Sequence, residues 1–222
     1  ILVFGSNPGR ILKEITVELP HPRARLDPGF RDLVERIYVE MTIRSAAEHA
    51  GKRVERFPGA GIGTILPPVS SNLLAGLLEA VAGPPYDGEA DLPVIAASLH
   101  MEIDDLFPVA ETLQMLRFAE VMGGDIRLTS EGRQFAGVDT DHRKRLFAQH
   151  LVTYVALAAH IRRVLDERPS HRAPWSRFAD ELEDYMSPDA AEQTLRAVID
   201  LSRYAEVFAY DDHTHAFSLD NP

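Results

Sequence analysis

The sequence contains no cysteine, which excludes disulfide bonds, thiolate nucleophiles and cysteine-ligated zinc. Long apolar runs are also missing, because none approaches the roughly 20 residues of a membrane-spanning helix. The first residues show no basic stretch followed by an apolar region and a cleavage site. We therefore expect a soluble protein without direct membrane insertion, suited to a reducing cytoplasm.

Basic residues are scarce relative to acidic ones. The 222 residues include 23 Lys and Arg against 34 Asp and Glu, which gives a formal net charge of −11. Such a surface repels phosphate backbones and anionic lipid headgroups over most of its area. Nucleic acid is therefore a disfavoured partner. The apolar content of 45% is enough for one large domain or two small ones with proper cores.

The stretch Leu116–Gly132, LRFAEVMGGDIRLTSEG, is typical of a winged-helix hairpin: a helix end, a short strand, a Gly-Gly-Asp turn, a second strand and a helix opening at Ser130. Its residues Arg117–Val121 recur at Arg203–Val207, with tyrosine in place of one phenylalanine. An internal repeat outranks local signals, so we predict two domains of the same type.

The helical spacing of apolar residues predicts the remaining elements of both halves. Residues 71–138 predict a helix from Ser71 or Asn72, a second capped by Asp91, a third with Ile103 inward, and then the hairpin. Residues 139–222 predict a long helix from about Asp141 to Arg168, two further helices and a second hairpin. The second helices share one spacing, with Leu92, Ile95, Ala96 and Leu99 matching Trp175, Phe178, Ala179 and Leu182. The predicted fold is mainly α with small β hairpins: tandem winged-helix repeats, each helix-helix-helix-wing.

Residues 1–44 form a different segment. Strands at 1–4 and 11–19 predict a hairpin, and Asp27 begins a helix with an apolar face through Leu33 and Met41. Because an isolated hairpin is marginal in water, we expect these strands to be the edge of a sheet whose other strands lie upstream of residue 1. Glycine and proline gather in residues 45–70, which predicts a linker.

DNA reading is the first alternative function of such a fold. A reading helix needs basic or amide side chains, but the third helix of the first repeat begins with Glu102, Asp104 and Asp105. The matching helix of the second repeat sets Arg196 and Arg203 against three acids. We therefore favour protein contact over a winged-helix transcription regulator.

Metal or anion sensing is the second alternative. Asp211, His213 and His215 lie at the second hairpin, and residues two apart on a strand point to the same side, so they form a candidate zinc or nickel set. Hairpin tips also collect such residues because they are solvated. His150 lies on an apolar helical stripe and is interpreted as a core residue.

Four charged residues hold equivalent places in the sequence repeat: Arg117 with Glu120, and Arg203 with Glu206. They either pair within each repeat, which would fix the hairpin against its helix, or line a binding groove. We favour the structural role. The glycines at 59, 61 and 63 lack the strand, helix and lysine of a nucleotide-binding loop, and no nucleophile grouping is visible, so no enzyme is predicted.

Several segments together resemble a known family. These are SNLLAGLLEAV, ADLPVIAASLHMEIDDLFPVAETLQMLRFAEVMGGDIRLTSEGRQFA, RKRLFAQHL and SRYAEVFAYDD. Over residues 66–219 they resemble the AAA-associated C-terminal domain of ATP-binding subunits of ABC importers for nitrate, sulfonate and bicarbonate. The opening ILVFGSNPGRILKEITVELPHPR resembles the end of such an ATPase domain, just after its switch histidine.

The resemblance implies a non-catalytic regulatory or assembly domain. It would contact the ABC ATPase domain and the transporter, form homo-oligomers, and be cytoplasmic and peripheral to the inner membrane. The Walker motifs, signature loop and switch histidine are absent from these residues, so ATP and Mg²⁺ would belong to the parent ATPase domain and no cofactor to this fragment.

Overall fold

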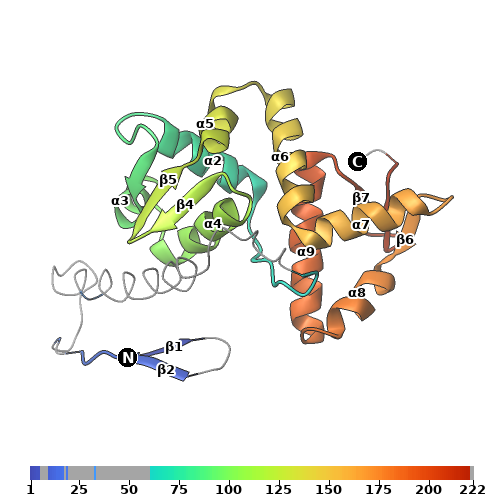
Figure 1. The fold of residues 1–222 in the computed structure, drawn as a ribbon, viewed down its shortest axis with the longest axis horizontal. Coiled ribbons are helices and arrows are strands. Elements are labelled where there is room, and N and C mark those ends of the chain that lie inside the picture. The colour runs from blue at the N-terminus through green and yellow to red at the C-terminus, as the bar shows by residue number, and fades with distance from the viewer. Residues whose placement is uncertain (6–9, 18, 20–32, 34–60, 221–222) are drawn as a thin grey trace, which may run out of the picture. The chain divides into compact units, whose positions relative to one another are not determined.

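The computed structural model describes residues 1–5, 10–17, 19, 33 and 61–220 (Figure 1). The chain divides into two compact units, Ile1–Arg53 with Met122–Asp125, and Val54–Val121 with Ile126–Pro222. The described part is mainly helical, with small two- and three-stranded sheets. This confirms the predicted fold class at the level of a helical protein with small β elements.

The first unit contains the predicted N-terminal hairpin. Strands β1 (Leu2–Gly5) and β2 (Arg10–Glu14) pair antiparallel, with Leu2 opposite Glu14. The Ile1 amine donates to the Ile15 carbonyl at 2.7 Å, and the Ile15 side chain is buried. The helix predicted from Asp27 lies outside the described residues, apart from Leu33. Residues 45–60 of the predicted linker also lie outside them.

The first repeat begins the second unit. Ser70 caps its first helix by accepting from the Asn72 amide at 3.2 Å, and Asp91 caps the next by accepting from the Val94 amide at 2.9 Å. Its three strands pair in the order β3-β5-β4. The elements are α2 (Ser71–Ala82), β3 (Glu89–Asp91), α3 (Leu92–Ser98), α4 (Ile103–Met115), β4 (Ala119–Met122), β5 (Asp125–Leu128) and α5 (Ser130–Gly137).

From α7 to β8 the second repeat has the same order of elements as the first has from α2 to β5, and its sheet has the order β6-β8-β7. Within it Ala173 lies opposite Phe217, which lies opposite Tyr210. The predicted three helices and hairpin are therefore present in both halves, each with a third strand that the sequence analysis missed. The elements are α6 (Thr140–Tyr154), α7 (Ala156–Glu167), β6 (Arg172–Pro174), α8 (Trp175–Glu183), α9 (Pro188–Ala205), β7 (Ala209–Asp211) and β8 (Ala216–Ser218).

The single helix predicted from Asp141 to Arg168 is wrong. It is interrupted at Val155, whose backbone is extended with φ −104° and ψ 98°. The run Val152–Val155 is β-branched and aromatic, so it favours helix weakly. The break lets α6 lie alongside α9 (Figure 1), while Val155 itself is buried at 3% exposure.

The repeat in the sequence and the repeat in the structure differ in register. Arg117 after α4 and Glu206 after α9 both adopt the left-handed backbone, with φ 63° and 54°. The next amides, of Phe118 and Val207, each donate to a carbonyl five residues back. Arg117 therefore corresponds to Glu206, and the prediction that it corresponds to Arg203 is wrong by three positions. Nearly the same five residues, with Tyr204 in place of Phe118, lead into a strand in one repeat and end a helix in the other.

Aromatic rings fill the cores of both repeats. In the first, the ring centroid of Phe118 lies 5.3 Å from Phe135 and 4.4 Å from His150. His150 is buried, and its Nδ1 lies 2.6 Å from the Leu116 carbonyl oxygen, which confirms its predicted place in the core. Phe147, which like His150 belongs to α6 of the second repeat, lies 5.9 Å from Phe118 and meets Tyr204 of α9 edge-on at 5.0 Å, so the two cores touch.

Candidate functional site

The second hairpin is fixed to α9 by arginine. Arg203 Nη2 donates to the Tyr210 carbonyl at 3.0 Å and to Asp212 Oδ2 at 3.1 Å. Arg196 also approaches Asp212, at 3.7 Å, and its guanidinium lies 5.5 Å from the centroid of the Trp175 ring. Arg203 therefore attaches the hairpin to its helix as the structural interpretation expected, but through Asp212 rather than Glu206.

Glu206 serves a different contact. Its carboxylate accepts from Lys144 Nζ of α6 at 2.5 Å, and this hydrogen bond raises the Lys144 pKa. In the first repeat, the Arg117 guanidinium lies 5.9 Å from the Tyr154 ring centroid, while Glu120 is exposed on β4. The four residues thus lie in four different environments and do not form one groove.

The candidate metal residues form a hydrogen-bonded turn. Asp211 Oδ1 accepts from the His213 amide at 2.8 Å and Oδ2 from the Thr214 hydroxyl at 2.9 Å. The bond from the His213 amide, then that from Thr214, lowers the Asp211 pKa. His215 Nδ1 instead lies 3.2 Å from the Tyr210 hydroxyl. In the part of the chain that the structure describes, no three His, Asp or Glu side chains are grouped so that they could hold a metal ion.

The third helix of each repeat has an acidic start. Asp104 and Asp105 are exposed in the first turn of α4, and Asp189 occupies the first turn of α9. Acids there complement the helix dipole and oppose phosphate. The arginines of α9 are already engaged, Arg196 with Glu192 at 3.3 Å and Arg203 with the hairpin.

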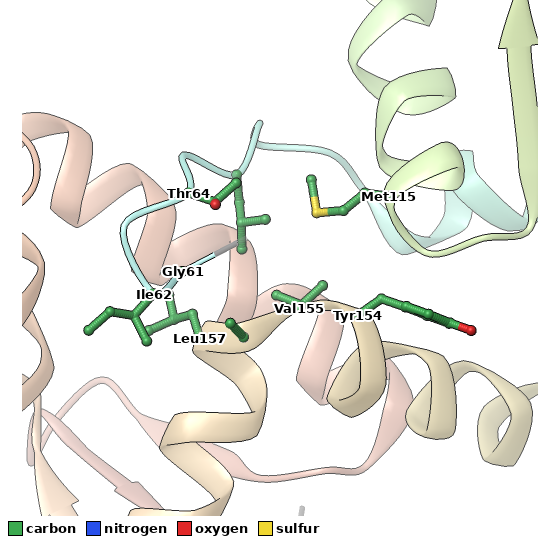
Figure 2. A pocket seen from close by; sticks show the side chains of 9 residues that line it. Gly61, Ile62, Thr64, Met115, Tyr154, Val155 and Leu157 are labelled. Atoms are coloured by element: carbon green, nitrogen blue, oxygen red, sulfur yellow. The ribbon is translucent and has the colours of Figure 1, made fainter. Parts of the chain in front are cut away.

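A small pocket lies beside the α6–α7 break (Figure 2). The segment before α2 supplies Gly61, Ile62 and Thr64, which face Val155 and Leu157 across it in the close-up. Its cavity is about 10 Å³, which is the room that one water molecule needs. This pocket is therefore a small gap in the packing rather than a ligand site.

A larger depression, the α2–α4 groove, lies on the first repeat. Its volume is about 280 Å³. Leu73, on the apolar side of its helix, is 43% exposed there, and Leu99 is 37% exposed. An apolar stripe cannot reveal from sequence whether its outermost residue is covered. The groove is lined by Asn72, Leu73, Gly76, Leu77, Leu99, Met101, Leu106 and Val109.

Comparison with known proteins gives one finding about the family. The family model described as the C-terminal AAA-associated domain matches residues 93–211, from α3 to β7 and more than half of the chain. The chain therefore belongs to the family of C-terminal AAA-associated domains, as its resemblance indicated. Membership implies an accessory role beside an ATPase domain. No curated protein and no solved structure matched the sequence.

None of the helices in the described ranges combines the length and apolar character needed to cross a lipid bilayer.

Proposed function

We propose that the chain is the non-catalytic C-terminal domain of the ATP-binding subunit of an ABC importer for nitrate, sulfonate or a similar small anion. It regulates or assembles the transporter through protein contacts, on the cytoplasmic side and peripheral to the inner membrane. The observation that carries this proposal is the family match, which runs from α3 of the first repeat to β7 of the second and so includes parts of both.

In this proposal each repeat is a winged-helix domain, residues 71–138 and 139–222. Three helices followed by a hairpin, with a third short strand at the sheet edge, support that assignment in both halves. Residues 1–44 are the end of the ATPase domain, and residues 45–70 connect it to the repeats. The β1–β2 hairpin agrees with such a sheet remnant.

Contact with protein rather than DNA is supported by charge. The exposed start of α4 carries Asp104 and Asp105, and a winged helix that reads DNA would place this helix in the major groove. Each acid there would face phosphate at close range, which is unfavourable. A protein partner with basic residues has no such penalty.

The two repeats are built to move as one body. The α6 helix of the second repeat packs on the first: Phe147 and His150 lie against the Phe118 ring, and Arg143 pairs with Glu79. A partner that binds one repeat therefore acts on the other without a flexible joint. Regulation follows if the bound partner favours one of two arrangements of the ATPase domains.

Light scattering of the chain, alone and with the ATPase domain added in trans, tests this proposal. We expect either a concentration-independent dimer or a stable complex with the ATPase domain. A monomer that ignores the ATPase domain would contradict contact regulation. A salt-dependent mobility shift on duplex DNA would favour a transcription regulator instead, and a melting temperature raised by zinc, nickel, nitrate or sulfonate would favour a sensor.

A further inference from the structure

The α2–α4 groove contains a glycine that the fold does not require. Gly76 lies in the middle of α2, where glycine costs roughly 1 kcal/mol relative to alanine. A Cβ built at Gly76 would have no atom within 4 Å, so no neighbouring element needs the missing side chain. The absence of a side chain leaves the α2 backbone open to a close approach from outside.

The second repeat closes the equivalent place. Counted from the start of α3 and α8, Leu99 corresponds to Leu182, which is fully buried. Aligned on Arg117 and Glu206, Asp105 of α4 corresponds to Thr194 of α9. Thr194 is also fully buried and its hydroxyl donates to Met186 Sδ at 3.7 Å. The groove is therefore a feature of the first repeat and not a general property of this fold.

The lining and the edge of the groove differ in chemistry. Asn72 is the single polar side chain among the eight lining residues. Asp105 lies one helical turn before Val109 and so on the same face of α4, with Asp104 beside it. Neither acid has an ion pair among the residues that the structure describes. An apolar floor with an acidic edge is complementary to a surface that is apolar in the middle and basic at its side.

We propose that the α2–α4 groove binds an amphipathic helix of a partner protein. Leucine-like side chains of that helix occupy the floor over Gly76, and a lysine or arginine lies beside Asp104 and Asp105. This is the helix-in-groove mode of recognition. The inference rests on the proposed contact function and names the surface that performs it.

The size and composition of the groove favour a helix over a small molecule. Its volume lies just below the roughly 300–1,000 Å³ of ligand pockets, and one amide offers little polar specificity. Leu73 and Leu99 frame it as exposed apolar walls from two different elements. Aliphatic knobs spaced along a helix would bury both walls at once.

Fluorescence anisotropy with two designed peptides tests this inference on the full chain. The probe is an 18-residue helical peptide of leucine and lysine, with leucines at helical spacing on one face. The matched peptide replaces every lysine by glutamate and keeps the leucines. We expect the lysine peptide to bind and the glutamate peptide to bind at least about tenfold more weakly, because paired and repelled charges differ by more than 1 kcal/mol.

Variants of the chain separate the groove from general acidity. Gly76→Leu fills the groove and should weaken binding about tenfold, whereas Gly137→Leu, at another glycine with open space, should leave it unchanged. Asp104→Asn with Asp105→Asn should weaken binding about fivefold. Asp180→Asn with Asp184→Asn removes the same charge from exposed positions at α8 and should have less than a twofold effect. Circular dichroism checks that each variant is folded.

Equal binding of the two peptides would overturn the inference, as would equal effects of the two double variants. The ATPase-domain complex provides the remaining distinction. If it forms and persists with Gly76→Leu, the groove is not the contact surface although the proposed function stands. If no complex forms with either chain while the lysine peptide binds the groove, the proposed function fails and the groove remains a peptide site.

Discussion

The two repeats share an order of elements from α2 to β5 and from α7 to β8, but they bury corresponding apolar residues to different extents. At the third position of α3 and α8, the first repeat has Val94, which is 55% exposed, and the second has Arg177, which pairs with Glu181 at 2.7 Å. Just after the end of α3, the first has the partly exposed Leu99, and at the matching place within α8 the second has the buried Leu182. At these two positions the second repeat has a charged or a buried side chain, where the first has an exposed apolar one.

Their hairpins differ in the same sense. The first turns on Gly123 and Gly124, both with positive φ, and needs no side chain to close. The second turns on Asp211 and is attached to α9 through Arg203 and Asp212. The comparison indicates that side chains of the second repeat stabilise its own fold, whereas the first repeat leaves apolar surface exposed for contact with a partner.

The largest expected difference between the repeats comes from lysine at the two equivalent leucines. Leu182→Lys places a charge in a fully buried site and should lower the free energy of unfolding by about 3–5 kcal/mol. Leu99→Lys, at a partly exposed site, should cost less than about 1 kcal/mol. Urea unfolding measures both. A large loss for Leu99→Lys would mean that the groove is packed and would break the comparison.

Glycine substitution tests a contact that belongs to the first repeat. A Cβ at Gly132 would lie 1.9 Å from the Phe118 carbonyl oxygen, since the start of α5 packs against the backbone before β4. Gly132→Ala should therefore destabilise by about 1–3 kcal/mol in urea unfolding. Gly137→Ala, where a Cβ has open space, is the matched control and should be neutral or stabilising. Two similar losses would contradict the close approach.

The structural register of the repeats is tested by three further glycine variants. Arg117 and Glu206 have left-handed backbones, which cost roughly 1 kcal/mol for a residue with a Cβ. Arg117→Gly and Glu206→Gly should therefore be neutral or stabilising by up to about 1 kcal/mol. Arg203→Gly lies inside α9 and should destabilise by at least about 1 kcal/mol. If thermal unfolding shows the same change in stability for Arg203→Gly as for Arg117→Gly, Arg117 would correspond to Arg203 as the sequence repeat predicts.

Much of the architecture was predictable because its signals are local. Asp91 at a helix start, the Gly-Gly turn and the apolar spacing of α8 each depend on neighbours within a few residues. The strands β3 and β6 were missed because three residues are too few to show a period. They exist only because a hairpin distant in the sequence offers them hydrogen bonds.

The candidate site was less predictable, because its features depend on tertiary packing. The helix break at Val155 follows from burial against other elements, and no proline or glycine marks it in the sequence. The sequence repeat misplaced Arg203 because nearly identical segments can end a helix or begin a strand. The groove was missed because the apolar stripes that contain Leu73 in one helix and Leu99 in the next show which residues are apolar, but not which of them other elements cover.

Acid should loosen the second hairpin through Asp211, an effect smaller than those above. Hydrogen bonds from the His213 amide and the Thr214 hydroxyl lower its pKa below the ordinary 3.8. A lowered carboxyl pKa means stabilisation that is complete above the unfolded value and is lost as the pH falls through the folded one. Below about pH 4, amide exchange at Phe217 of the second hairpin should therefore accelerate beyond its intrinsic pH dependence.

The variant Asp211→Asn isolates this carboxylate. Asparagine keeps an oxygen that accepts from the His213 amide but does not titrate, so the turn should form without the added acid sensitivity. Exchange at Ile126, beside a turn made of Gly123 and Gly124, should be the same in the two chains. An acid response at Phe217 that survives in Asp211→Asn would assign the pH dependence to another group. The difference in how the two hairpins are closed would then not extend to their response to pH.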